Sequence, residues 1–159
     1  MIRPAANAPN HGYELANTLF EVDGDDLLVG GIAVRSIVSA VGSPIYIYDG
    51  RQMRQAYRRL ADALGGFASI YYSAKANPAR PVIRLFLEEG AGIEIASLGE
   101  YHAAIAAGAS PDRIIFAGPG KRRQELEAVI DGGIGEIHIE GFDEIARICS
   151  IGKPVRVSI

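Results

Sequence analysis

The stretch of sequence that decides the fold is a short apolar run that ends in one lysine and a turn. Residues 71–78 read Tyr71-Tyr72-Ser73-Ala74-Lys75-Ala76-Asn77-Pro78. The run is typical of a β-strand, and the Asn-Pro pair ends it, so the sequence predicts Lys75 at the carboxyl end of a strand. Such a lysine either extends into solvent or offers an amine for imine chemistry, and on this stretch alone both interpretations stay open.

Outward from this stretch, strand-like segments alternate with amphipathic helical segments. Strands are predicted at about 68–74, 92–95, 113–117, 135–139 and 154–159. This alternation is typical of successive βα units on a parallel sheet. The units could close as a small doubly wound sheet or could be the opening of a (β/α)8 barrel, which typically needs about 250 residues. Because the sequence stops within a strand that no helix covers, we expect a truncated chain.

Capping and turn residues predict where the helices begin and end. Ser97 and Glu100 have the spacing of a capping box ahead of an alanine-rich helix, and Gly108 stands where a glycine favours the end of that helix. Apolar residues recur at helical spacing between residues 51 and 64, and Gly65-Gly66 follows them. The sequence therefore predicts one helix in each of these two segments.

The first third of the chain is organised differently. Residues 1–17 are predicted to be a flexible leader. The segment Asp23-Gly24-Asp25-Asp26 predicts the turn of a hairpin. A short helix is expected at about 34–41, closed by Gly42, and residues 44–48 alternate like a strand.

Composition and charge narrow the possible functions. The chain has 159 residues, of which 48% are hydrophobic and 22% are charged, with a net charge of −3. This composition argues against nucleic acid or an anionic membrane as the main partner. The cationic clusters at 51–59 and 121–123 are expected to be solvated helix faces. With one cysteine and no membrane-spanning or signal segment, we expect a cytoplasmic protein.

Several segments carry a resemblance to a known family. Residues 72–78 resemble the Y-A-x-K-A-N motif of the fold-type III pyridoxal-phosphate decarboxylases, the family of diaminopimelate, ornithine and arginine decarboxylases. Residues 90–100 look like the family's G-x-G-x-[DE]-x-x-S-x-x-E segment, and residues 115–126 look like its next strand and loop. The opening is most similar to diaminopimelate decarboxylases, in residues 20–31 and 42–49.

The resemblance implies an α/β fold. The chain would contain the first five βα units of an alanine-racemase-like (β/α)8 TIM barrel, left incomplete. Residues 1–17 would be the leader, residues 18–48 would join a β-domain, and residues 49–159 would form the N-terminal part of the barrel that binds pyridoxal phosphate. Full-length members of the family are expected to be homodimers.

The resemblance also implies roles for four side chains. Lys75 would be the catalytic lysine that binds pyridoxal 5′-phosphate covalently. Glu94 would face the cofactor and influence the protonation of that lysine, or else would be a charge paired within the barrel mouth. Ser97 is interpreted first as an N-cap and second as a hydroxyl near the cofactor. Asn77 is expected to shape the turn, with a polar contact to the cofactor as a second interpretation. No histidine or cysteine spacing supports a metal site.

The implied activity is the pyridoxal-phosphate-dependent decarboxylation of an amino acid, a carbon–carbon lyase reaction. The resemblance favours conversion of meso-diaminopimelate to lysine, in lysine biosynthesis. Other cofactor contacts of the family would lie beyond residue 159, so this chain alone is expected to be inactive. One alternative substrate is another amino acid, free or tethered to a carrier protein. The other alternative is a non-catalytic barrel that binds pyridoxal phosphate, which would not need residues 18–48.

Overall fold

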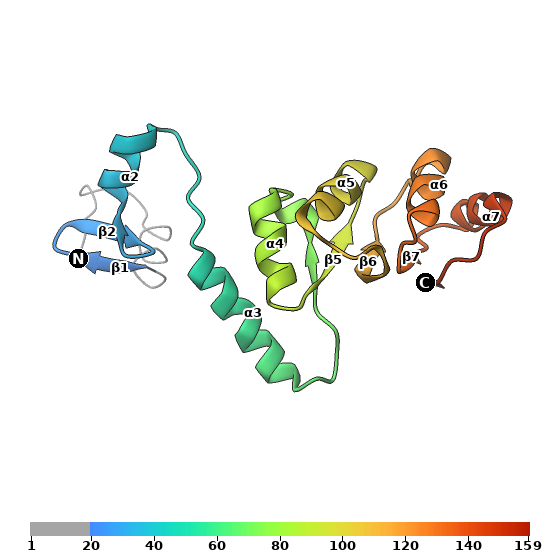
Figure 1. Cartoon of the computed structure of the whole chain (residues 1–159), viewed down its shortest axis with the longest axis horizontal. Coiled ribbons are helices and arrows are strands. Elements are labelled where there is room, and N and C mark those ends of the chain that lie inside the picture. Colours follow the sequence, from blue (N-terminus) through green and yellow to red (C-terminus); the bar gives the residue numbers. More distant parts are fainter. Residues whose placement is uncertain (1–19) are drawn as a thin grey trace, which may run out of the picture. The chain divides into compact units, whose positions relative to one another are not determined.

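The structure is a computed structural model that describes residues 20–159. The predicted leader, residues 1–17, and the start of the predicted β-domain segment lie outside the described residues. The chain forms two compact units that divide between Met53 and Arg54 (Figure 1).

The first unit contains a small antiparallel sheet followed by a helix. Its elements are β1 (Glu21–Asp23), β2 (Asp26–Val29), β3 (Ile32–Ala33) and α2 (Val34–Val41). Asp23 lies opposite Asp26, and Gly24 takes the positive φ of 59° that this two-residue turn favours. The predicted hairpin is therefore confirmed, and so is the helix that ends at Gly42.

The strand predicted over residues 44–48 is wrong. These residues form no regular structure, and the side chains of Tyr46 and Tyr48 are largely exposed. Alternating apolar residues form a strand only where another strand offers hydrogen bonds, and none of the described strands pairs with this segment. The segment instead leads to Asp49, whose carboxylate accepts hydrogen bonds from the backbone N–H groups of Arg51, at 2.9 Å, and Gly30, at 3.2 Å.

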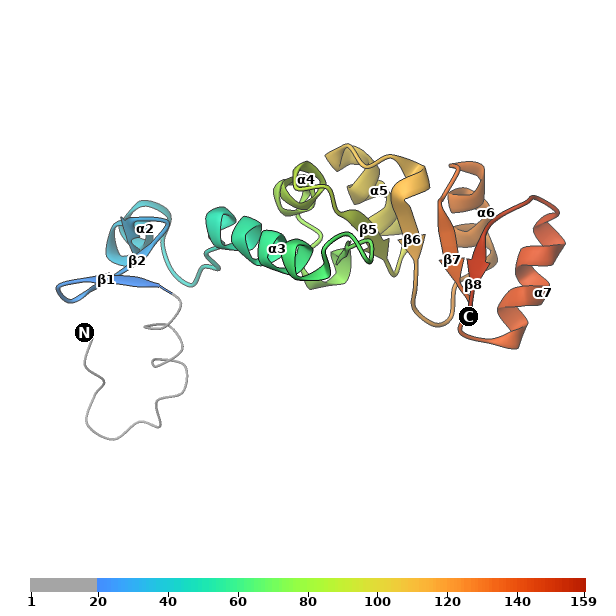
Figure 2. The same cartoon turned by 90° about the horizontal axis from the view of Figure 1, so that it is seen from below.

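The second unit is a parallel sheet whose successive strands are joined by helices (Figures 1 and 2). Its strands are β4 (Tyr71–Ser73), β5 (Gly92–Ile95), β6 (Ile114–Phe116), β7 (Glu136–His138) and β8 (Val157–Ser158). The α-helices are α3 (Gly50–Leu64), which begins before the division, α4 (Arg80–Glu88), α5 (Leu98–Ala107), α6 (Arg123–Asp131) and α7 (Phe142–Ile151). Two 3-10 turns complete the unit, η1 (Ala74–Ala76) and η2 (Pro111–Arg113). All five predicted strands are confirmed.

The order of the strands distinguishes between the two expected architectures. A doubly wound sheet reverses its strand order at a switch point, whereas β4 to β8 pair in chain order and all in parallel. With right-handed crossovers, this order places the connecting helices on one face of the sheet, as in the wall of a (β/α)8 barrel. Within the described residues β4 and β8 each pair on one side only, so the sheet is open and does not close into a barrel by itself.

The core lies between the sheet and its helices. Ile93, Ile95, Ile114, Phe116 and Ile137 are buried, and the strand register places them on one face. Full burial of each such side chain contributes about 1.5–3 kcal/mol. The helices complete this cluster with Ile83, Tyr101, Ala104, Leu126, Val129 and Ile148. The opposite face of the sheet therefore remains available for polar side chains.

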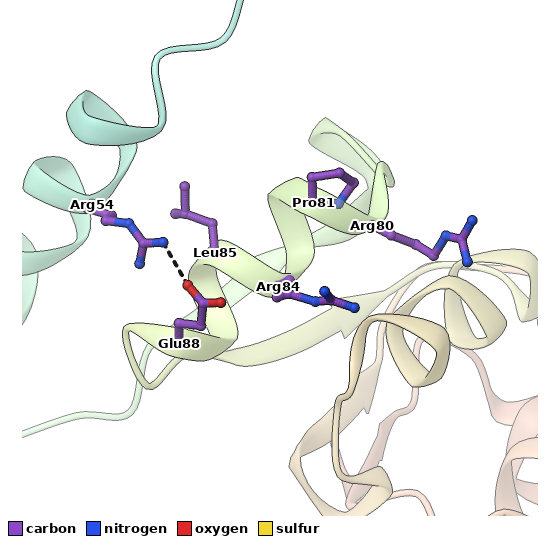
Figure 3. Close-up of a pocket in the computed structure, with 6 residues that line it drawn as sticks. All are labelled: Arg54, Arg80, Pro81, Arg84, Leu85 and Glu88. Atoms are coloured by element: carbon purple, nitrogen blue, oxygen red, sulfur yellow. Dashed lines mark hydrogen bonds and ion pairs between the residues drawn. The ribbon is translucent and has the colours of Figure 1, made fainter. Parts of the chain in front are cut away.

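Ion pairs fasten α3 to α4 within the second unit. Arg54 binds Glu88 at 2.7 Å and Glu89 at 2.9 Å, and Arg58 binds Glu89 at 2.6 Å. Figure 3 shows Arg54 reaching Glu88, while Arg80 and Arg84 point away from this pair. The Arg58 and Arg54 guanidinium groups lower the pKa of the Glu89 carboxyl from 4.5 to about 2. Part of the predicted solvated face at 51–59 is thus engaged in ion pairs.

The lowered pKa of Glu89 predicts an acid-dependent loss of stability. Its folded-state pKa lies below the ordinary value, so this carboxylate stabilises the fold above about pH 4.5 and stops doing so as the pH falls toward 2. We expect Glu89→Gln to lower the melting temperature at pH 7, and the difference from wild type to shrink as the pH falls through this window. Thermal melts across the window measure it, with Glu127→Gln, which removes an exposed i,i+4 pair, as the control. A difference that stays constant with pH would contradict the prediction.

A close backbone approach before β7 predicts that Gly135 tolerates no larger residue. A Cβ atom there would lie 2.1 Å from the backbone oxygen of Asp112. We expect Gly135→Ala to destabilise the chain by about 1–3 kcal/mol in denaturant unfolding, as overpacked sites do. Gly99→Ala is the matched control, because the nearest atom to a Cβ there is 3.8 Å away and alanine favours helix. Equal stability of the two variants would show that the close approach is absent.

Candidate active site

Every loop that follows a strand of the parallel sheet emerges at the same end of that sheet, called here the carboxyl end. β4 leads there into Lys75, β5 into Ser97, β6 into the glycine-rich loop 117–121, and β7 into Glu140. Barrel enzymes place their active sites at this end. The candidate site is therefore built from the first residues after each strand.

Lys75 and Glu94 meet at the carboxyl end. The strand register places Ser73 opposite Glu94, on the face of the sheet away from the helices. The Ser73 hydroxyl donates to Glu94 Oε1 at 3.0 Å, and Lys75 Nζ lies 3.5 Å from the same oxygen. The Lys75 side chain is 66% exposed and that of Glu94 is 25% exposed. An incoming ligand can therefore reach the amine, while the carboxylate beside it can hold the ammonium form or accept its proton.

The Asn77 side chain shapes the turn after Lys75, as predicted. Its Oδ1 accepts a hydrogen bond from the Ala79 backbone N–H at 2.9 Å, directly before α4 begins. Its backbone carbonyl accepts a hydrogen bond from the Tyr72 hydroxyl at 3.1 Å. These two bonds fix the chain on both sides of Lys75, and a contact between Asn77 and the cofactor stays a prediction.

Ser97 caps α5, as predicted, but the capping box is not reciprocal. The Ser97 hydroxyl oxygen accepts from the Glu100 N–H at 3.2 Å. The Glu100 carboxylate accepts from the Ala96 N–H at 2.7 Å, where the sequence pattern predicts the Ser97 N–H. The loop after β5 is thus fixed by two bonds, and the Ser97 hydroxyl can still donate its own proton toward a ligand. Its contact with the cofactor stays a prediction.

The prediction that Lys121 belongs to a solvated cationic face is wrong. Its side chain is only 1% exposed, and its Nζ donates to Glu144 Oε2 at 3.1 Å and to the His138 carbonyl at 2.6 Å. Gly118 and Gly120, with φ of 96° and 76°, turn the loop before this lysine. No local pattern reveals the burial, because the partner carboxylate comes from α7, the next helix but one.

The Glu144 carboxylate joins the loops that follow β6 and β7. It accepts hydrogen bonds from the backbone N–H groups of Lys121, at 3.4 Å, and Glu140, at 3.1 Å. Burial opposes its ionisation, but the Glu140 N–H and the Lys121 ammonium outweigh burial and lower its pKa. Glu140 in turn accepts from the Gly118 N–H at 2.5 Å. The sequence analysis missed both glutamates because each acts through a contact distant in sequence.

Neither a metal site nor a membrane span emerges from residues 20–159. In this part of the chain, no group of three or more histidine, cysteine, aspartate or glutamate side chains is placed to hold a metal ion. None of its helices combines the length and the apolar character needed to cross a bilayer.

A family comparison covers the segment that forms this candidate site. Residues 50–159 match the model of a family described as "Pyridoxal-dependent decarboxylase, pyridoxal binding domain". The chain belongs to this family. The match begins where α3 begins and includes the whole carboxyl end described above. Pyridoxal phosphate is therefore the cofactor to consider at Lys75.

Two curated relatives illustrate the activities known in the family. A diaminopimelate decarboxylase of Methanothermobacter thermautotrophicus is 36% identical over 140 residues, which cover 86% of this chain and 32% of the relative. An L-glutamyl-[BtrI acyl-carrier protein] decarboxylase of Niallia circulans is 36% identical over 130 residues, which cover 79% of this chain and 30% of the relative. The chain thus spans about a third of the length of these relatives.

In the comparison with solved structures, too, this chain matches only about a third of the other protein. The crystal structure of AQ1208 from Aquifex aeolicus superimposes with a TM-score of 0.85 at 30% sequence identity. The match covers 92% of this chain and 37% of that structure. The predicted fold, the N-terminal part of a decarboxylase barrel, is confirmed.

The side chains at the carboxyl end fit pyridoxal phosphate. The cofactor carries an aldehyde, for which an accessible primary amine is the required partner, and Lys75 supplies one. Glu94, 3.5 Å from that amine, would be placed to exchange a proton with it. When bound, the cofactor supplies an electron-accepting ring that stabilises the carbanion left by loss of carbon dioxide.

The exposure of the three lysines predicts how fast each is acylated. Lys75 and Lys153 have side chains 66% and 53% exposed, whereas that of Lys121 is 1% exposed. With limiting acetic anhydride, we expect Lys121 to react about tenfold or more slowly than the other two, because it must first open from the fold. Peptide mapping by mass spectrometry measures this directly. Equal labelling of all three lysines would contradict the buried position of Lys121.

Proposed function

We propose that this chain forms the cofactor-binding part of a pyridoxal-phosphate-dependent amino-acid decarboxylase and that Lys75 binds the cofactor. The observation that carries the proposal is the accessible Lys75 amine, held beside Glu94 at the carboxyl end of the first strand of the sheet. Membership of the pyridoxal-dependent decarboxylase family supports it. No other lysine in the chain combines exposure with this position.

The surrounding residues have distinct roles in this proposal. Glu94 keeps the Lys75 amine near the ring and exchanges a proton with it. Ser73 donates to Glu94 Oε1 and so leaves the carboxylate aimed at the lysine. Asn77 holds the turn that presents Lys75, and Ser97 offers a hydroxyl from the adjacent loop. These side chains bind the cofactor and orient the Lys75 amine, and Glu94 is the group placed to transfer a proton.

The substrate we propose is meso-diaminopimelate, with lysine as the product, in lysine biosynthesis. The diaminopimelate decarboxylase from Methanothermobacter thermautotrophicus supports this choice. The Niallia circulans relative supports a second candidate, an amino acid tethered to a carrier protein, because its identity to this chain is equal.

The proposal extends to the organisation of the whole enzyme. We propose that residues 18–48 join a β-domain and that residues 49–159 belong to the barrel. We also propose that the complete enzyme is a cytoplasmic homodimer. The separation of a small antiparallel sheet from the parallel sheet supports two domains. The family resemblance of the opening supports the assignment of the first segment.

The proposal predicts that cofactor binding depends on Lys75. Titration of the chain with pyridoxal phosphate should produce the visible absorbance band of a lysine–pyridoxal adduct. Lys75→Ala should abolish the band, because it removes the lysine amine that lies beside Glu94. Lys153→Ala removes a lysine of similar exposure and should leave the band intact. A band that survives Lys75→Ala but disappears in Lys153→Ala would overturn the assignment.

The open sheet predicts that the 159-residue chain alone does not turn over substrate. β4 and β8 lack neighbours on their outer sides within the described sheet, so the barrel interior that encloses a substrate is incomplete. We expect no carbon dioxide release above background from meso-diaminopimelate or from an L-glutamyl carrier protein. Turnover of either would contradict this expectation and would identify the substrate class.

A further inference from the structure

The candidate for a further role is the buried pair of Lys121 and Glu144. Buried ion pairs add little net stability, because desolvation of both charges offsets their attraction. This pair is nearly inaccessible, with side chains 1% and 4% exposed and Nζ 3.1 Å from Oε2. Its other hydrogen bonds go to backbone groups at the carboxyl end, namely the Lys121 and Glu140 N–H groups in the two loops and the His138 carbonyl at the end of β7.

The bonds of this pair reach the loop after β6, the end of β7 and the loop after β7. Lys121 Nζ donates a hydrogen bond of 2.6 Å to the backbone carbonyl oxygen of His138, the last residue of β7. Glu144 holds the backbone N–H groups of Lys121 and Glu140, one in each loop. Arg147 donates to the Lys121 carbonyl at 2.8 Å, so the backbone of this residue is held on both sides. The pair therefore fixes the ends of the loops after β6 and β7 to the first turns of α7.

The fixed loop reaches the neighbourhood of the cofactor site. Gly118 is held by the Glu140 carboxylate, and the preceding residue, Ala117, donates its backbone N–H to the Ile95 carbonyl at 2.9 Å. Ile95 is the last residue of β5 and lies between Glu94 and Ser97 in the sequence. A displacement of the glycine-rich loop would thus reach the segment between Glu94 and Ser97 through direct contact.

We propose that Lys121 and Glu144 are positioning residues for the cofactor site. They hold the loops after β6 and β7 at the carboxyl end, and through Gly118, Ala117 and Ile95 they fix the segment that carries Glu94 and Ser97. This inference rests on the proposed function, because the property it affects is the binding of pyridoxal phosphate at Lys75. Neither residue touches the reacting amine.

The test replaces both charges at once. Removal of one partner would leave a buried charge and destabilise the fold, whereas an apolar pair of similar volume can keep stability. We therefore compare wild type with the double variant that combines Lys121→Met and Glu144→Met, called here the methionine pair. The matched control is Lys153→Met with Asp131→Asn, which removes an exposed lysine–carboxylate pair that belongs to neither loop.

Two readouts separate positioning from stability. The first is amide hydrogen exchange, which needs no cofactor. In the methionine pair we expect exchange about tenfold or more faster in peptides covering 117–121 and 139–141, with α5 unchanged and the melting temperature close to that of wild type. The second is the titration with pyridoxal phosphate, where we expect the apparent affinity for the cofactor to fall about tenfold. Residues that orient a metal ligand without touching the metal have effects of this size. The exposed control pair should change neither.

Each outcome decides the proposal. Faster exchange in both loops with weaker cofactor binding at retained stability supports it. Unchanged loop exchange, or unchanged cofactor affinity in a folded methionine pair, overturns it and leaves the pair a structural feature. If wild type itself forms no adduct at Lys75, the proposed function fails, and this inference fails with it. If the methionine pair does not fold, Lys121→Met with Glu144→Gln replaces it, and the same changes are expected at smaller size because the amide oxygen keeps one acceptor.

Discussion

Parallel pairing of the strands in chain order is the constraint on which the rest of the structure depends. Because every strand from β4 to β8 runs in the same direction, every following loop emerges at one end of the sheet. The register that places Ser73 opposite Glu94 also brings Lys75, two residues after Ser73, to that carboxylate. The apolar face, with Ile93, Ile114 and Ile137, supplies the burial that holds this register. Burial of apolar side chains on one face of the sheet therefore determines which polar side chains meet on the other face.

The two lysine–glutamate pairs at the carboxyl end differ in how accessible they are to solvent and ligands. Lys75 and Glu94 lie 3.5 Å apart and are partly exposed, so the amine is available to a ligand. Lys121 and Glu144 lie 3.1 Å apart and are almost completely buried, and they bind the His138 carbonyl and the Glu140 N–H respectively. The same two residue types thus form one pair that a ligand can reach and one pair that the fold encloses. Desolvation accounts for the difference, because a buried ammonium must keep its partner.

Much of the fold could be predicted from the sequence, because its local signals agree with one another. The helix over 34–41 and the cap at Ser97 each depend on neighbours in sequence, and the structure has both. The failures depend on distant contacts. Residues 44–48 have a strand pattern but no partner strand within the described part of the chain, and Lys121 is buried by a glutamate from another helix. Charge patterns predict exposure only when no such partner exists.

For the candidate site, sequence motifs located Lys75 and Glu94, and the structure brings them together. The supporting glutamates 140 and 144 carried no motif and were found only from their hydrogen bonds. The most direct test of the account is to incubate the chain with pyridoxal phosphate, reduce it with borohydride, and map the modified lysine by mass spectrometry. The account predicts a phosphopyridoxyl group on Lys75 and its absence in Lys75→Ala. Selective modification of Lys153, or no selective modification at all, would contradict it.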